Sequence, residues 1–432
     1  MISLESLLLP LLAVVAAPPA LLGATLLLGI HWRQGMEARI AAIHSLCLLA
    51  ASLLVVQAWW TGPTAAQELV LPPLLHLDGY RWQPMFLVDA LSLLYLVLVA
   101  LIYPVIVRFS IPSFHREPGL RRYWFLVTLL AASLWLLCVA GNLDTLFVAW
   151  ELVGVSSVML IGFFHRQVRA AQNSLRALVY YRISDFLILL AALLIHHSFP
   201  QQRFLQFSED STTPHALVVA LALLGGSMAK SAQLPMSPWL HRAMEGPASS
   251  SAIFYGALSV HLGPFLLLRT CDLWMTQPIA RVAMAIVGLS TAVWARLVGR
   301  TRPDAKTSLA YSTMAQIGIM YIELACGAHT LVAVHLFAHA GLRTWQYLRS
   351  SSLIQDFQDN PVFAGSIHLQ RKLSWERVLP ARLQSALYLG AVRLFWIDGL
   401  QWHFVVRPFL SVFRSVSRLE DRLLGRADQG PQ

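Results

Sequence analysis

The sequence predicts an all-α polytopic membrane protein, and three observations support this fold class. Of the 432 residues, 57% are hydrophobic and only 12% are charged, and the mean hydropathy is +0.60. Soluble domains are close to half apolar and a quarter charged. Apolar runs long enough to cross the hydrocarbon core recur along the chain, which predicts about 11–13 transmembrane helices. No alternating ten-residue pattern of a β-barrel is present.

The apolar runs give the order of the expected spans. Eleven clear runs and a weaker twelfth lie at 5–30, 38–60, 85–107, 123–140, 143–164, 175–198, 215–240, 248–270, 278–298, 307–326, 329–348 and 383–413. The first run is too long for a signal-peptide core and lacks a basic leader, so we expect a retained span.

Three regions follow from these runs. Residues 1–350 are expected to form the transmembrane bundle, and 351–382 a polar cytoplasmic segment. Residues 383–432 form a C-terminal helical region, in which apolar residues recur at helical spacing with arginines between them. Such a tail is either an amphipathic helix on the membrane surface or a helix that docks a partner.

The net charge is +10, and the distribution of the basic residues among the loops indicates orientation in a membrane. Basic residues concentrate in every second loop: Arg33, Arg39, Arg108, Arg116, Arg121, Arg122, Arg166, Arg169, Arg176, Arg242, Arg300, Arg302 and Lys306. The positive-inside rule places these loops in the cytoplasm and the N-terminus in the periplasm of a bacterial inner membrane. Because the charge lies in short loops beside a lipid bilayer and not in a basic stripe interleaved with aromatics, nucleic acid is not an expected partner.

No metal or cofactor site is expected in this chain. The four cysteines, Cys47, Cys138, Cys271 and Cys326, are far apart and lack metal-ligand spacing. No nucleotide-binding loop is present either.

Ionisable residues inside the spans indicate proton transfer, because each costs several kcal/mol unless it is paired or hydrated. Lys230 precedes Pro235, and the run at 228–240 predicts a broken helix of the kind that lines a hydrated cavity. Glu151 is the natural partner for Lys230. A buried lysine can release its proton when a carboxylate moves away, whereas arginine cannot.

Further ionisable residues lie in other spans. Arg182 and Asp185 share a helical face and can pair. His335, His339 and Arg343 follow at i, i+4 and i+8, Glu323 lies late in the tenth span, and Glu245 precedes the eighth. Several of these residues have a structural alternative. Arg182 and Asp185 can be a purely structural ion pair, and His335 and His339 can be core histidines bonded to the backbone. Glu245 can be a solvated interface residue.

Five strings resemble the antiporter-like subunits of respiratory complex I, above all subunit L, and the Mrp antiporter subunits. They are FVAWELVGVSSVMLIGFF, YYRISD, AKSAQLPMSPWLHRAMEGP, KTSLAYSTMAQIGIM and VHLFAHAGLR, within residues 80–350. The resemblance implies an inverted-repeat bundle that conducts protons. It also implies a switching pair of Glu151 and Lys230, a modulating pair of Arg182 and Asp185, and a central relay through His335 and His339.

Several departures from this family bear on conduction. Arg343 stands where the family has a lysine, and it cannot relay a proton. Tyr255 stands where a histidine is usual, with His261 six residues later, and Glu323 is an extra carboxylate. The chain is also expected to lack the last spans and the lateral helix of the complex I subunit.

The shortened form most resembles DabB, the membrane subunit of DAB inorganic-carbon accumulation complexes. The resemblance implies a DabA-type, zinc-containing soluble partner in which the hydration of carbon dioxide is driven by proton flow through this subunit. Three alternatives stay open: a subunit of NADH-quinone oxidoreductase, a cation/proton antiporter module, and a membrane subunit that conducts nothing.

Overall fold

Long apolar runs form long helices here, because in lipid every backbone polar group must be satisfied within the segment. The computed structural model describes residues 4–30, 32, 35–62, 66–77, 80–114, 118–196, 199, 201–208, 215–350 and 380–423. The chain divides into two units, Met1–Arg371 and Lys372–Gln432, which are described separately below.

Seven helices among the described residues are long and apolar enough to cross a membrane. They are α1 (Leu4–Leu27), α2 (Met36–Thr61), α3 (Ala90–Phe114), α4 (Leu120–Cys138), α5 (Leu143–Ile161), α6 (Val168–His196) and α12 (Pro278–Gly299). These helices correspond to the first six expected spans and the ninth.

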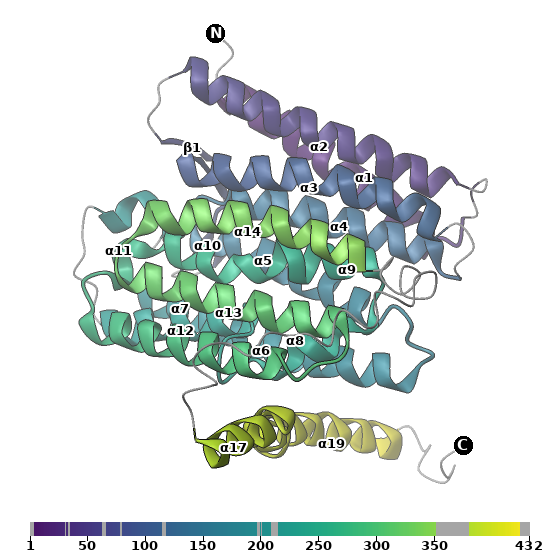
Figure 1. Cartoon of the computed structure of the whole chain (residues 1–432). Helices are drawn as coiled ribbons and strands as arrows, with labels where there is room; N and C mark the ends of the chain where they lie inside the picture. The colour runs from purple at the N-terminus through teal and green to yellow at the C-terminus, as the bar shows by residue number, and fades with distance from the viewer. Residues whose placement is uncertain are drawn as a thin grey trace. The chain divides into compact units, whose positions relative to one another are not determined.

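Three further helices belong to the same bundle but are shorter or more polar. They are α7 (Ala216–Lys230), α13 (Ala305–Ala325) and α14 (His329–Ser350). Figure 1 shows α14 beside α13, and α14 also contacts α3. α13 and α14 are as long as a membrane span, and they carry the polar residues singled out above, which lowers their hydropathy.

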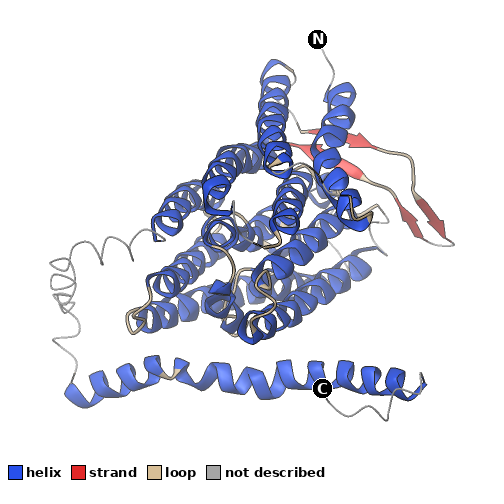
Figure 2. Ribbon diagram, turned by 90° about the vertical axis from the view of Figure 1, so that its right-hand side faces the viewer, coloured by secondary structure: helices blue, strands red, loops and turns tan. Residues whose placement is uncertain are grey.

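The third expected span begins later than predicted. Its first residues form strand β4 (Met85–Val88), which pairs antiparallel with β1 (Gln67–Val70). A second pair joins β2 (Leu75–Leu77) to β3 (Tyr80–Trp82), and these strands lie beside the N-terminal helices (Figure 2). A short apolar run does not by itself distinguish a strand from a helix end, which explains the error.

Asp89 lies just before α3 and not within a span. Its Oδ1 accepts the backbone N–H of Ser92 at 2.8 Å, and its Oδ2 pairs with Arg269 at 2.5 Å. Asp89 therefore caps a helix N-terminus, a position that favours a carboxylate.

The predicted broken helix is present, and its freed backbone groups find partners. α7 ends at Lys230, and the chain resumes helical form in α8 (Pro238–Arg242). Trp239 Nε1 donates to the carbonyl of Ala229 at 2.9 Å, and Leu234 N donates to Thr291 Oγ1 at 2.9 Å. The first contact closes the break on itself, and the second anchors it against α12, which contains Thr291.

The eighth expected span is also interrupted. The short helices in this region are a 3-10 turn (Ala243–Glu245), α9 (Ala248–Ser251), a π-helical turn (Ala252–Ala257), a 3-10 turn (Ser259–His261), α10 (Leu262–Arg269) and α11 (Cys271–Trp274). Ser231 Oγ donates to the carbonyl of Val260 at 2.6 Å, so the two interruptions bond to each other. Irregular backbone at this depth is tolerated because protein surrounds it.

The C-terminal unit is a run of helices with a kink. It comprises α17 (Ala381–Val392), a 3-10 turn (Leu394–Trp396), α18 (Ile397–Gln401), a π-helical turn (Trp402–Val406) and α19 (Arg407–Leu423). Positive φ angles at Leu394, Phe395 and Trp396 interrupt the expected run at 383–413. Residues 351–379, which hold most of the expected polar segment, lie outside the described part. The surface or docking role of the tail stays a prediction.

Glycines set the close approach of α12 and α13. A methyl group added at Gly318 would lie 2.6 Å from the carbonyl oxygen of Gly288, in backbone that cannot move aside. Small residues at such crossings allow membrane helices to pack backbone to backbone.

We therefore expect Gly318→Ala to lower the unfolding free energy in detergent by about 1–3 kcal/mol, because overpacking forces the helices apart. Thermal unfolding of the purified protein measures this change. Gly341→Ala is the matched control, since nothing lies within 4 Å of an added methyl group there. Equal melting temperatures for both variants would contradict the expectation.

Candidate functional site

Lys230 is the centre of the candidate site. Its side chain is fully buried at the C-terminal end of α7, and Nζ donates to the carbonyl of Trp150 at 3.1 Å. The same nitrogen lies 4.4 Å from the ring centroid of Tyr181 and 4.9 Å from that of Trp150. A helix C-terminus and two aromatic faces both favour a cation, and a desolvated cation–π contact is worth about 2 kcal/mol.

Two carboxylates and one guanidinium stand beside this lysine. Arg182 pairs with Glu151 at 2.5 Å and with Asp185 at 2.8 Å. The predicted Arg182–Asp185 pair is therefore confirmed as a contact. Among the described residues the ion-pair partner of Glu151 is Arg182, whose forked guanidinium binds the carboxylate. The switching partnership of Glu151 with Lys230 stays a prediction. Lys230 still interacts electrostatically with all three groups.

His339 lies in the middle of a hydrogen-bonded chain. Its Nδ1 is 2.9 Å from Nε2 of His261, which comes from the interrupted eighth run. Arg343 donates from Nε to His339 Nε2 at 3.0 Å, and its other nitrogens donate to Gln346 at 2.7 Å and Ser312 at 2.5 Å. The described partners of this buried cation are therefore all neutral.

A second group lies one turn earlier on α14. His335 Nδ1 is 3.0 and 3.2 Å from the two oxygens of Glu323, and its Nε2 is 3.1 Å from Oε1 of Gln316. The rings of His335 and His339 are 6.1 Å apart. The predicted stripe of His335, His339 and Arg343 thus lies along one face of α14.

Buried hydroxyls occupy the space between these two regions. Tyr321 of α13 donates to Ser227 Oγ at 2.9 Å, one turn before Lys230. Ser231 Oγ, directly after Lys230, bonds to the carbonyl before His261. All three hydroxyl-bearing residues are buried. Polar groups therefore continue from the Lys230 region towards the histidines.

Two predicted site residues, Glu245 and Tyr255, take no part in the contacts described above. Glu245 lies in a 3-10 turn and accepts a hydrogen bond from Asn173 at 3.4 Å. The backbone of Tyr255 lies in the π-helical turn, and its side chain lies outside the described part.

Sequence reasoning missed several contact residues. Trp150 and Tyr181 adjoin Glu151 and Arg182 in the sequence, so a search of their neighbours for aromatic rings would have found them. Gln316, Ser312 and Gln346 carry no such signal, because uncharged polar residues are common in helices. Arg269, the partner of Asp89, was also missed.

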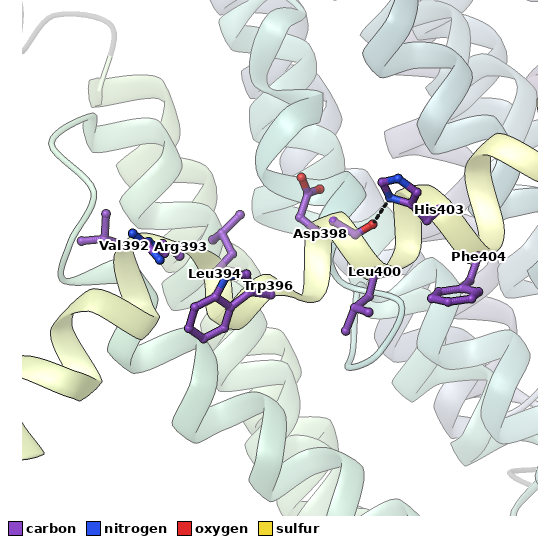
Figure 3. A pocket seen from close by; sticks show the side chains of 9 residues that line it. Val392, Arg393, Leu394, Trp396, Asp398, Leu400, His403 and Phe404 are labelled. Carbon is purple, nitrogen blue, oxygen red and sulfur yellow. Dashed lines mark hydrogen bonds between the residues drawn. The ribbon is translucent and has the colours of Figure 1, made fainter.

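The C-terminal unit has a separate pocket of about 600 Å³ (Figure 3). Its lining residues are Val392, Arg393, Leu394, Trp396, Asp398, Gly399, Leu400, His403 and Phe404. His403 Nδ1 bonds to the carbonyl of Gly399 at 3.0 Å. None of the predicted site residues lines this pocket.

Comparison with protein families gives a match that covers more than half of the chain. The model described as "NADH:quinone oxidoreductase/Mrp antiporter, TM" matches residues 140–377. The chain belongs to this family. The matched stretch contains both interrupted runs and every residue of the Lys230 and histidine groups.

Known relatives agree with this assignment. The chain is 34% identical over 274 residues to NADH-quinone oxidoreductase subunit L of Buchnera aphidicola, covering 62% of this chain and 45% of the relative. It is 31% identical over 321 residues to the probable inorganic carbon transporter subunit DabB1 of Halothiobacillus neapolitanus, covering 71% and 57%. The chain thus spans about half the length of these relatives.

A solved structure gives the same fold. The Mrp complex from Dietzia sp. DQ12-45-1b matches with a TM-score of 0.69 and 26% identity, over 78% of this chain and 37% of the other. The resemblance inferred from the sequence is therefore confirmed. The chain is a multi-pass, antiporter-like membrane subunit of the complex I and Mrp type.

The contact between Gly154 and Lys230 can be tested by a double-mutant cycle. A methyl group at Gly154 would lie 3.2 Å from Lys230 Nζ, closer than ordinary contact. We expect Gly154→Ala and Lys230→Met to be coupled by about 0.5–3 kcal/mol in unfolding free energy, because methionine lacks the crowded ammonium. Thermal unfolding of the four proteins measures the coupling. Additive effects would show that the ammonium does not occupy this place.

Proposed function

We propose that the chain is a proton-conducting membrane subunit whose proton flow energises a partner protein. The observation that carries this proposal is the buried ammonium of Lys230, which makes no ion pair with a carboxylate among the described residues. A lysine held in this way can bind and release a proton as nearby charges move.

The adjacent ion pairs supply charges that could move. Arg182 is shared between Glu151 and Asp185, and its side chain is about one-third exposed. A shift of the guanidinium towards one carboxylate frees the other to attract the Lys230 ammonium. Each such exchange alters the proton affinity of Lys230 without breaking the helices that hold it.

The finer proposal is that the coupled process is inorganic-carbon uptake. It is supported by the similarity to the DabB1 relative, which extends over 71% of this chain. We propose a DabA-like, zinc-containing soluble partner, with no cofactor in this chain. The similarity to a subunit L and to an Mrp complex supports the second candidate, a module of a respiratory or antiporter complex.

The proposed orientation has the N-terminus in the periplasm of a bacterial inner membrane and the arginine-rich loops in the cytoplasm. Its support is the alternation of basic and basic-poor loops along the sequence. Aromatic and apolar side chains exposed on the outer helices, such as Trp60 and Ile286, suit contact with lipid.

The conduction proposal predicts that Lys230→Ala abolishes proton flux in native membrane vesicles while the subunit remains assembled. The expected loss is roughly 100-fold or more, since a positioned proton-transfer group contributes at least this factor. Pyranine fluorescence inside the vesicles measures the flux. Lys306→Ala at the start of α13 is the matched lysine control and should conduct normally. Undiminished flux in Lys230→Ala would refute conduction through this site.

The carbon-uptake proposal predicts that a zinc-containing soluble protein co-purifies with the chain from native membranes. Mass spectrometry of the isolated complex, together with its zinc content, identifies the partner. Recovery of dehydrogenase or antiporter subunits in its place would favour the second candidate and exclude the first.

A further inference from the structure

His335 and His339 lie one turn apart on α14, but they face different hydrogen-bond partners. His335 faces two oxygen acceptors, whereas His339 faces the donor Nε of Arg343 and a nitrogen of His261. We propose that Arg343 keeps a transferable proton off His339. In this part of the pathway, the transferable proton is held by the Glu323–His335 pair. This inference rests on the proposed function, since it names the proton-holding residues of the same pathway.

The partners of His339 leave no place for a second proton. An arginine side chain only donates hydrogen bonds, so Nε2 of His339 must accept the bond from Arg343 Nε. His339 therefore carries its single proton on Nδ1, which donates to Nε2 of His261 at 2.9 Å. Protonating Nε2 would set two N–H groups against each other beside a fixed positive charge.

The partners of His335 favour the opposite state. Both of its ring nitrogens face oxygen atoms, with the Glu323 carboxylate at Nδ1 and Oε1 of Gln316 at Nε2. A neutral ring has one N–H and can satisfy only one of these acceptors, whereas an imidazolium satisfies both. The arrangement therefore fits a protonated His335 paired with an ionised Glu323.

Exposure and neighbouring charges support the same division. The side chains of His335 and Glu323 are 19% and 14% exposed, whereas His339 is a buried residue. The groups that face or act on His335 are Glu323 and Gln316 from α13, His339 on its own helix, and His261 from the interrupted run. Among these the carboxylate of Glu323 is the acidic group, so the proton is drawn towards it.

One proton can move between His335 and Glu323. The N–H bond at Nδ1 of His335 breaks, an O–H bond forms on Glu323, and both groups become neutral. The reverse step restores the ion pair, so the two residues can hold and pass one proton without help from His339. Arg343 acts as a positioning residue, because it works through the ring of His339.

Two glutamine substitutions on the same helix test this proposal. Glutamine at position 339 can accept from Arg343 and donate to His261, so His339→Gln reproduces the neutral histidine and should lose much less proton flux than His335→Gln. Glutamine at position 335 cannot carry the charge, and we expect His335→Gln to lose roughly 100-fold or more, as for a positioned acid–base group. Glu323→Gln should lose flux in the same way.

The measurement is again proton flux into native membrane vesicles, with subunit content and melting temperature checked for each variant. An equal or greater loss in His339→Gln would overturn the proposal. Normal flux in His335→Gln would also overturn it, as expected if Gln316 presents its amide N–H to a neutral ring. Lys230→Ala separates the two proposals: if it conducts, the proposed function fails, and if it alone blocks flux, only the present inference fails.

Discussion

Burial of the Lys230 ammonium is the constraint on which the rest of the bundle depends. A desolvated charge costs several kcal/mol unless it finds compensating partners. The structure supplies a helix C-terminus, the carbonyl of Trp150 and two aromatic faces. The end of α7 at this residue is therefore part of the site, since it places the partial negative charge of a helix C-terminus beside the ammonium.

The interruption that follows α7 is hydrogen-bonded to a second one. Ser231, directly after Lys230, bonds to the carbonyl of Val260 in the interrupted eighth run. His261 follows that carbonyl and bonds to His339 of α14. Two breaks in separate helices thus bring the lysine region and the histidine region into one buried polar band, crossed by the hydroxyl of Tyr321.

Arg343 makes the surroundings of His339 in this polar band different from those of His335. A lysine there could hold or release a proton, whereas the guanidinium remains charged and donates from fixed directions. Its contacts with Gln346 and Ser312 hold the guanidinium, and its contact with His339 fixes the orientation of that ring. His335, which pairs with Glu323, lies one turn from His339 and is more exposed. A proton on α14 is therefore held more favourably by this pair than by His339.

The sequence by itself determined the membrane class, most of the helix order, the break after Lys230 and the stripe on α14, because hydrophobic runs, prolines and helical spacing act locally. Only the tertiary structure decided which charges pair. Arg182 and not Lys230 takes Glu151, and His261 reaches His339, because these contacts join helices far apart in the chain. Whether the apolar residues 85–88 form a strand or a helix also depended on their pairing with β1, which local periodicity does not encode.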